Sequence, residues 1–77
     1  LALEAARTGG TAGAILNGAN EAAVALFLQD QIGFLEVPQL VSAARMAVPV
    51  KQNPVLEDIL EADRLAREAV RIKYLER

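Results

Sequence analysis

The segment from Ala14 to Gln31 constrains the fold most, because apolar residues occupy nearly all of its positions. It is rich in Ala and Leu and poor in β-branched residues, which favours a helix over a pair of buried strands. Its apolar residues fall on every side of a 3.6-residue wheel, and a helix with this pattern is usually buried. We therefore expect a central helix packed among other helices. Gly18, between Asn17 and Asn20, could bend this helix or delay its start to Asn20.

A first helix is predicted before the central one. The composition of residues 1–8 favours a helix, and Gly9-Gly10 can adopt the left-handed conformation that closes it. Thr11 then provides a side chain that can cap the central helix. The sequence begins at Leu1 with neither an initiator Met nor a cap, so we expect it to be a piece of a longer chain.

Two further helices are predicted after the central one. The first of them starts near Leu35 or Glu36, because Pro38 fits only the first turn of a helix, and Pro49 ends it. Residues 48–54 contain two prolines and no helical period, which is typical of a linker. Asn53-Pro54 is a suitable cap and first position for the last helix, which runs to the end of the sequence.

The last helix has one charged face and one apolar face. Three acids, Glu57, Asp58 and Glu61, stand in its first turns, which suits the helix dipole. Three bases, Arg71, Lys73 and Arg77, stand in its last turns. Asp63 and Arg67 are four residues apart with the acid first, a spacing that favours an ion pair. The apolar positions recur at helical spacing: Leu56, Ile59, Leu60, Ala62, Ala66, Ala69, Val70 and Tyr74. The sequence therefore predicts an all-α fold, a small four-helix bundle-like domain that covers residues 1–77.

Composition excludes several kinds of chemistry. The 77 residues contain no Cys, His or Trp, which removes thiolate nucleophiles, Cys/His zinc sites, His-dependent triads and disulfides. Eight basic residues stand against ten acidic ones, for a net charge of −2, so nothing favours nucleic acid or an anionic membrane as a partner. The longest apolar run, 22–28, is far shorter than the roughly 20 residues of a spanning helix.

Asn17, Asn20 and Glu21 are the polar side chains of the central helix. One hypothesis makes Glu21 a general base or metal ligand that the two amides orient. The other makes the three residues a structural set, buried and hydrogen-bonded, because a buried polar group without a partner costs roughly 1 to 3 kcal/mol. We favour the structural set, since a general base also needs a pocket and further catalytic groups.

Two other motifs have simpler explanations than a binding site. Glu57, Asp58, Glu61 and Asp63 could be imagined as a cluster for a hard metal ion, but neighbouring acids on a helix point in different directions. We expect a solvated face, with Asp63 at the border of the apolar stripe. The glycines of residues 9–13 lack the spacing and the lysine of a phosphate loop, so helix termination explains them better.

Several segments, taken in order, resemble the carboxy-terminal helical domain of 1-deoxy-D-xylulose 5-phosphate reductoisomerase. They are Gly9-Gly10-Thr11-Ala12, Ile15-Leu16-Asn17-Gly18-Ala19-Asn20-Glu21-Ala22-Ala23-Val24, Phe27-Leu28, Ile32-Gly33-Phe34, Val37-Pro38 and Leu56-Glu57-Asp58-Ile59-Leu60-Glu61-Ala62-Asp63. The resemblance covers essentially the whole chain. The sequence departs from the family pattern in having Gly13 in place of Pro, Gly18 in place of Ala and Leu35 in place of a Ser or Thr cap.

The resemblance implies a domain that supports a larger enzyme. The family is homodimeric and uses NADPH and Mg²⁺ or Mn²⁺ to convert 1-deoxy-D-xylulose 5-phosphate into 2-C-methyl-D-erythritol 4-phosphate, a step of non-mevalonate isoprenoid synthesis. Its cofactor-binding and catalytic domains lie upstream, so we expect no catalytic, cofactor-binding or metal-binding residue here and no activity of the isolated fragment. The expected partner is the catalytic domain of the same chain, in a bacterial cytoplasm, or in a plastid if the source is a plant or alga.

Two other classes of function compete with this interpretation. One is a free-standing module for protein interaction or dimerisation, whose uncapped first helix would pair with another chain. The other is a helix-turn-helix DNA-binding domain, which is disfavoured because its basic cluster of Arg64, Arg67, Arg71 and Lys73 is interleaved with acids.

Overall fold

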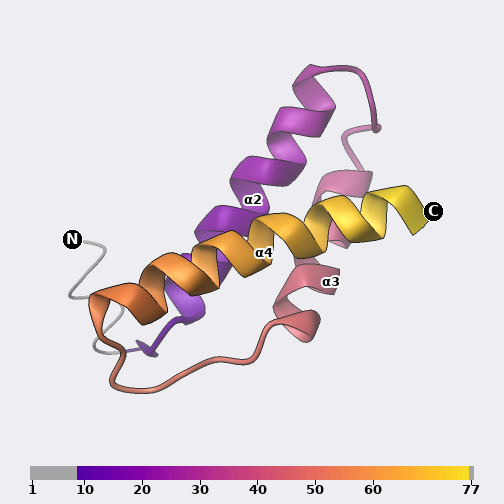
Figure 1. Cartoon of the computed structure of the whole chain (residues 1–77). Coiled ribbons are helices and arrows are strands. Elements are labelled where there is room, and N and C mark those ends of the chain that lie inside the picture. The colour runs from indigo at the N-terminus through magenta and orange to yellow at the C-terminus, as the bar shows by residue number, and fades with distance from the viewer. Residues whose placement is uncertain (1–8, 77) are drawn as a thin grey trace.

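The computed structural model describes residues 9–76, which contain three helices and no strand (Figure 1). These are α2 (Ala12–Leu28), α3 (Glu36–Ala47) and α4 (Leu56–Glu76). The all-α prediction is confirmed. The predicted first helix lies outside the described residues, so what is seen of the four-helix bundle is these three helices.

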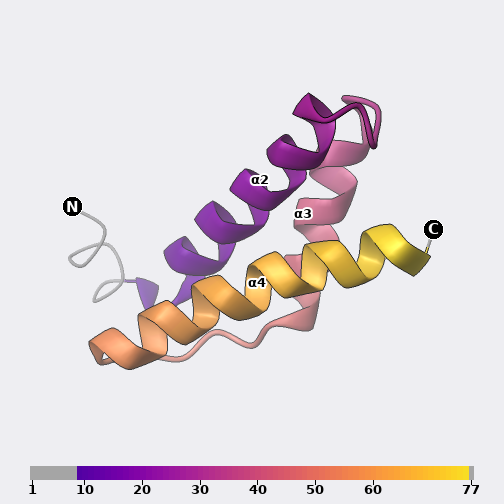
Figure 2. The ribbon, with the colours of Figure 1, turned by 45° about the horizontal axis from the view of Figure 1, so that its top comes forward.

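The three helices pack against one another in pairs. A turn at 29–35 joins α2 to α3, and a linker along one end of the three helices joins α3 to α4. Helix α4 crosses both α2 and α3 (Figures 1 and 2). None of the three described helices combines the length and apolar character that a bilayer-spanning helix requires.

The core of the bundle is built largely from small side chains. Alanines at five buried positions let the helix axes approach closely, and a few branched side chains fill the space between them. The buried apolar residues are Ile15, Ala19, Ala23, Ile32, Val37, Leu40, Ala44, Val48, Ala62, Ala66 and Val70. On α4 these are the predicted apolar positions 62, 66 and 70, whereas Leu56 and Leu60 are each 60% exposed.

The prediction of a central helix buried on all sides is wrong. Helix α2 is unbroken from Ala12, so Gly18 neither interrupts it nor delays its start. Only one side of α2 is buried, through Ile15, Gly18, Ala19 and Ala23, while Leu16 and Leu28 are 47% and 74% exposed. The reason is geometric: within residues 9–76 only two helices pack against α2, and they cover part of its circumference.

The beginning of α2 is fastened to the linker between α3 and α4. Gly10 has a φ of +64°, the left-handed conformation expected of it, and a side chain there would collide with the Lys51 carbonyl. The Thr11 amide donates to that carbonyl at 3.0 Å, and the Thr11 hydroxyl accepts from the Lys51 amide at 2.8 Å. Thr11 is therefore not the side-chain cap that was predicted, because its buried hydroxyl bonds the linker instead.

The starts of α3 and α4 are stabilised by acids within the helices. The Gly33 amide donates to the Glu36 carboxylate at 3.0 Å, and the Val55 amide donates to the Asp58 carboxylate at 3.0 Å. The prediction that α3 starts near Leu35 or Glu36 is confirmed. The prediction of Asn53-Pro54 as the start of α4 is wrong: Asn53 takes a φ of +52°, which Asn tolerates better than most residues, and α4 begins at Leu56.

Candidate functional site at the crossing of α2 and α4

Helices α2 and α4 approach each other closely at Gly18. A Cβ atom on Gly18 would lie 2.5 Å from Asp63 Oδ1 and 2.9 Å from the Asp63 main-chain oxygen. These separations are too short for real Cβ contacts, so only glycine fits at this position without a shift of the helices. The crossing also brings the polar residues of α2 next to the charged residues of α4.

Arg67 joins the two helices at this crossing. Its Nε donates to Asp63 Oδ2 at 3.0 Å along α4, and its terminal nitrogen donates to Glu21 Oε1 on α2 at 2.9 Å. The other Glu21 oxygen accepts from the Asn17 amide at 3.3 Å. Four side chains thus form a connected cluster, which we call the crossing network: Asn17, Glu21, Asp63 and Arg67.

The predicted polar set is only partly present in this network, and it is not buried. Asn17, Asn20 and Glu21 are all exposed, because α2 turns these positions away from the core side that contains Ile15 and Ala19. The Asn20 side chain forms no hydrogen bond within residues 9–76. The expected cost of an unsatisfied buried group therefore does not apply to these three residues.

The Asp63–Arg67 pair could be predicted from its spacing, and the structure contains it. The role of Arg67 as the partner of Glu21 was missed. These residues are separated by 46 positions, and nothing in the local pattern of either helix indicates which faces meet. Only the close approach that Gly18 permits brings them within hydrogen-bonding distance.

The electrostatics of the crossing network suit structural support better than catalysis. The hydrogen bond and the charge of Arg67 lower the pKa of the Glu21 carboxyl below its ordinary value of 4.5. The hydrogen bond to Asp63, followed by that to Glu21, raises the pKa of the Arg67 guanidinium. Glu21 is thus ionised at neutral pH with both oxygens occupied, whereas a general base would need a pKa near the working pH.

The lowered pKa of Glu21 predicts an acid-sensitive stability. A group whose pKa is lower in the folded state stabilises the fold above its unfolded pKa, and this contribution is lost as the pH falls through the folded pKa. We therefore expect the free energy of unfolding to fall less between about pH 6 and pH 3 in Glu21→Gln than in the unaltered protein. Urea unfolding at several pH values measures the free energy of unfolding of both proteins.

The control for this prediction is Glu57→Gln, which removes an exposed acid of α4 that forms no ion pair within residues 9–76. Its profile should follow that of the unaltered protein. If the pH profile of Glu21→Gln also matched that of the unaltered protein, the Glu21–Arg67 pair would contribute nothing to the acid sensitivity of the fold.

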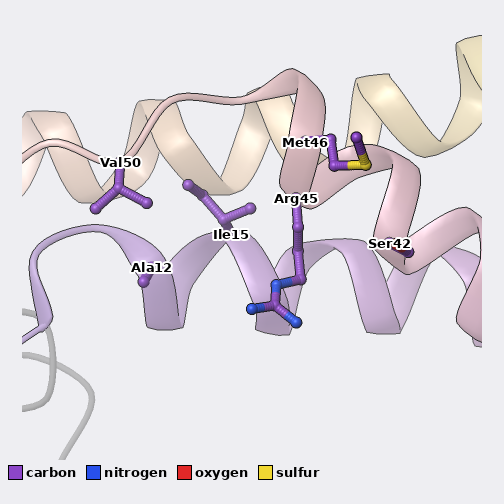
Figure 3. Close-up of a pocket in the computed structure, with 6 residues that line it drawn as sticks. All are labelled: Ala12, Ile15, Ser42, Arg45, Met46 and Val50. Carbon is purple, nitrogen blue, oxygen red and sulfur yellow. The ribbon is translucent and has the colours of Figure 1, made fainter.

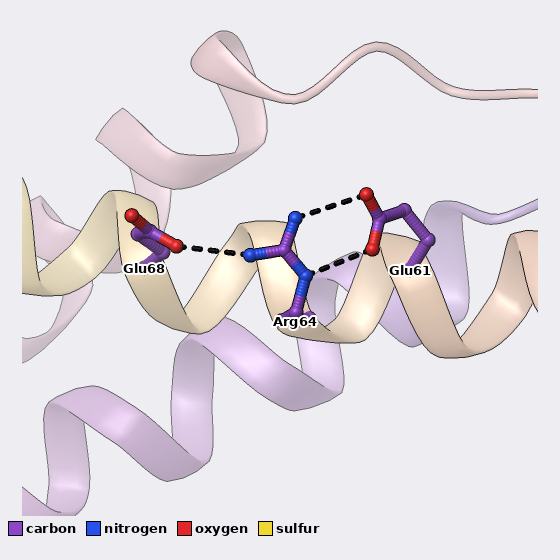
Figure 4. A network of polar contacts seen from close by, with 3 residues as sticks. All are labelled: Glu61, Arg64 and Glu68. Carbon is purple, nitrogen blue, oxygen red and sulfur yellow. Dashed lines mark hydrogen bonds and ion pairs between the residues drawn. The ribbon is translucent and has the colours of Figure 1, made fainter.

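Other charges of α4 are also paired. Arg64 donates two hydrogen bonds to Glu61, at 2.8 and 2.9 Å, and one to Glu68 at 3.1 Å (Figure 4). Lys51 pairs with Asp58 at 2.8 Å. The acids Asp58, Glu61 and Asp63 thus each bind a different cation, as expected of acids that point in different directions.

No metal site is found where the structure describes the chain. Within residues 9–76, no group of three or more acidic side chains converges on a point where an ion could be held. The main depressions on this part of the surface are open and shallow, and none of them is lined by Arg67, Glu21 or Asp63.

Comparison with known proteins gives one consistent result. Residues 1–69 match the family described as the DXP reductoisomerase C-terminal domain. The 1-deoxy-D-xylulose 5-phosphate reductoisomerase of Rippkaea orientalis is 54% identical over 72 residues, which are 91% of this chain and 18% of the relative. The enzyme of the same name from Synechococcus sp. strain JA-2-3B'a(2-13) is 55% identical over 67 residues, or 87% of this chain and 17% of the relative.

A third bacterium gives the same match. The 1-deoxy-D-xylulose 5-phosphate reductoisomerase of Acetivibrio thermocellus is 47% identical over 70 residues, which are 91% of this chain and 18% of the relative. The chain thus spans less than a fifth of the length of each of these three curated relatives. With nearly all of its residues matched, the chain belongs to the family of DXP reductoisomerase C-terminal domains.

Proposed function

We propose that residues 1–77 form the carboxy-terminal support domain of a longer DXP reductoisomerase and contribute no catalytic group of their own. The crossing network is the main observation in favour. Its charged side chains are used to hold α2 against α4, with Glu21 and Asp63 both bound to Arg67. A domain whose polar residues stabilise its own packing is suited to holding other parts of an enzyme in position.

The activity of the whole enzyme is part of this proposal. The relatives are named 1-deoxy-D-xylulose 5-phosphate reductoisomerase, and the reaction of the full-length chain would be the NADPH-dependent rearrangement and reduction of that substrate in isoprenoid synthesis. We place NADPH and the divalent metal in other domains of that enzyme. Within residues 9–76 no group of three or more acids could hold a metal, and Glu21, Asp58, Glu61 and Asp63 are paired with cations. Both groups would bind upstream in a homodimeric enzyme of the bacterial cytoplasm.

A free-standing interaction module is the competing proposal. Exposed apolar residues such as Met46 and Leu35 are compatible with either function. The match to less than a fifth of each relative favours a domain whose apolar surface is covered within a larger enzyme.

The experiment that tests the support role uses the full-length enzyme with Val70→Ala. Val70 is fully buried, so its truncation leaves a cavity and should cost about 2 kcal/mol of domain stability. In a domain of this size that loss lowers the unfolding temperature by roughly 10 °C. We expect turnover to be lost about 10 °C lower than in the unaltered enzyme, while NADPH binding persists to the original temperature.

Ile72→Ala is the matched control, since this residue is on the same helix and 48% exposed. It should leave the temperature at which turnover is lost nearly unchanged. A Val70→Ala enzyme that keeps full turnover at temperatures where its carboxy-terminal domain is already unfolded would refute the support role.

A further inference from the structure

One open depression on the bundle combines an apolar surface with a cation that has no ion pair within residues 9–76. It has a volume of about 270 Å³ and lies between the start of α2, the end of α3 and the following linker (Figure 3). We call it the entry groove, and it is lined by Ala12, Ile15, Ser42, Arg45, Met46 and Val50. No residue of α4 contributes to it.

Large apolar side chains in and beside the entry groove are exposed to water. Met46 is 86% exposed and Val50 is 47% exposed. Leu16, which lies one turn after Ala12 on α2, is also 47% exposed. Covering these three side chains would remove substantial apolar surface from water, at about 25 cal/mol for each Å².

Like Lys73 in a depression between α3 and α4, Arg45 lines its groove without an ion pair within residues 9–76. Its side chain extends from α3 towards α2 (Figure 3). Within residues 9–76 it has no carboxylate partner, whereas Arg64 and Arg67 are each bound by two acids. The neighbouring depression beside Thr11 also contains a cation, Lys51, but this is already paired with Asp58.

The path of the chain indicates what covers the groove. Thr11 directly precedes Ala12 in the groove wall and is hydrogen-bonded to Lys51, which directly follows Val50 in the same wall. The described part of the chain therefore begins at the edge of the groove. Most of the length of the family's enzymes is outside this chain, and a carboxy-terminal domain follows the rest of its protein.

We propose that the entry groove docks an apolar segment of the same polypeptide from the part that precedes Gly9, with a carboxylate of that segment paired to Arg45. A segment joined directly to the edge of the groove has a high effective concentration there, which a separate partner lacks. The proposal rests on the support function and adds the surface through which the domain is attached.

Thiol labelling of the full-length enzyme tests this proposal. These 77 residues contain no Cys, so the labelled peptide that carries Met46→Cys can be identified by mass spectrometry. Leu28→Cys is the control, because Leu28 is 74% exposed and lies at the opposite end of α2. We expect a maleimide to label Met46→Cys at least about tenfold more slowly than Leu28→Cys, since labelling then requires the groove to open.

The possible outcomes separate this proposal from the support function. Fast labelling at residue 46 with protection at residue 28 would refute docking at the entry groove. The proposed support function would still stand, since the domain would then dock by the other end of α2. Fast labelling at both positions, together with an unaffected Val70→Ala enzyme, would overturn both proposals. Protection at residue 46 that is lost on dilution would assign the groove to a second copy and overturn an occupant from the same chain.

A second pair of variants tests the carboxylate. In the Met46→Cys enzyme, Arg45→Glu should raise the labelling rate severalfold, because two carboxylates would then face each other. Arg71→Glu is the control, as Arg71 is exposed and has no ion pair within residues 9–76. Equal labelling rates in the two charge-reversal variants would refute an acidic partner for Arg45.

Discussion

Replacement of Gly18 by Leu is expected to lower the free energy of unfolding of the domain by about 3 kcal/mol, because it forces a side chain into a close contact between α2 and α4. A Cβ atom alone would lie 2.9 Å from the Asp63 main-chain oxygen. The Asp63 side chain can rotate away, at the expense of its bond to Arg67, but the main-chain oxygen can move only with the whole of α4. Thermal or urea unfolding measures the loss.

Gly13 provides the matched control for this prediction. It lies in the first turn of the same helix and is exposed, and a Cβ atom there would have no neighbour within 4 Å. Gly13→Leu should therefore be neutral or stabilise by up to about 1 kcal/mol through helix propensity. Gly18→Ala should cost less than Gly18→Leu, because it introduces a single methyl group. Equal stabilities for the Gly13 and Gly18 variants would show that α4 is not held close to α2.

The sequence predicted α2, α3 and α4, although not the start of α4, and it did not predict which side of α2 is buried. Proline and glycine positions predicted the start of α3, the end of α3 and the linker, because these residues restrict or extend the backbone conformations locally. The buried side of α2 could not be predicted, since apolar residues lie all around it. Within residues 9–76, the side on which α3 and α4 pack against α2 leaves Ile15 buried and Leu16 exposed.

The contacts of the crossing network were likewise only partly predictable from the sequence. The Asp63–Arg67 pair depends on helical spacing alone and was predictable. The contact of Glu21 with Arg67 depends on which faces of α2 and α4 meet, and this depends on the absence of a side chain at Gly18. Because the local pattern made α2 wholly apolar, Asn17, Asn20 and Glu21 were expected to be buried, whereas the structure exposes all three.

Ile15 and Leu16 give the sharpest test of the packing of α2, because they are adjacent in sequence and differ in burial. Ile15 is 2% exposed and belongs to the core, whereas Leu16 is 47% exposed. Ile15→Ala should lower the free energy of unfolding by about 2 to 5 kcal/mol, through lost burial and the cavity that remains. Leu16→Ala should cost less than about 1 kcal/mol, since about half of this side chain is already in contact with water in the folded state.

The stability loss expected from Ile15→Ala is large enough to affect the folding of the whole domain. A core of this size supplies only about 3 to 5 kcal/mol, so Ile15→Ala removes much or all of the stability that the domain has by itself. In the full-length enzyme, contacts along the entry groove would add stability to the folded domain, and the same substitution should then be tolerated at a higher temperature than in the isolated domain. Calorimetry of Ile15→Ala in the isolated domain and in the full-length enzyme tests this, because equal unfolding temperatures would show that the rest of the enzyme does not stabilise the bundle.

Because Ile15 also lines the entry groove, Val70→Ala should be measured alongside Ile15→Ala. A stabilisation by the rest of the enzyme that is smaller for Ile15→Ala than for Val70→Ala would place the attachment at the groove itself, whereas equal stabilisation would place it elsewhere on the bundle.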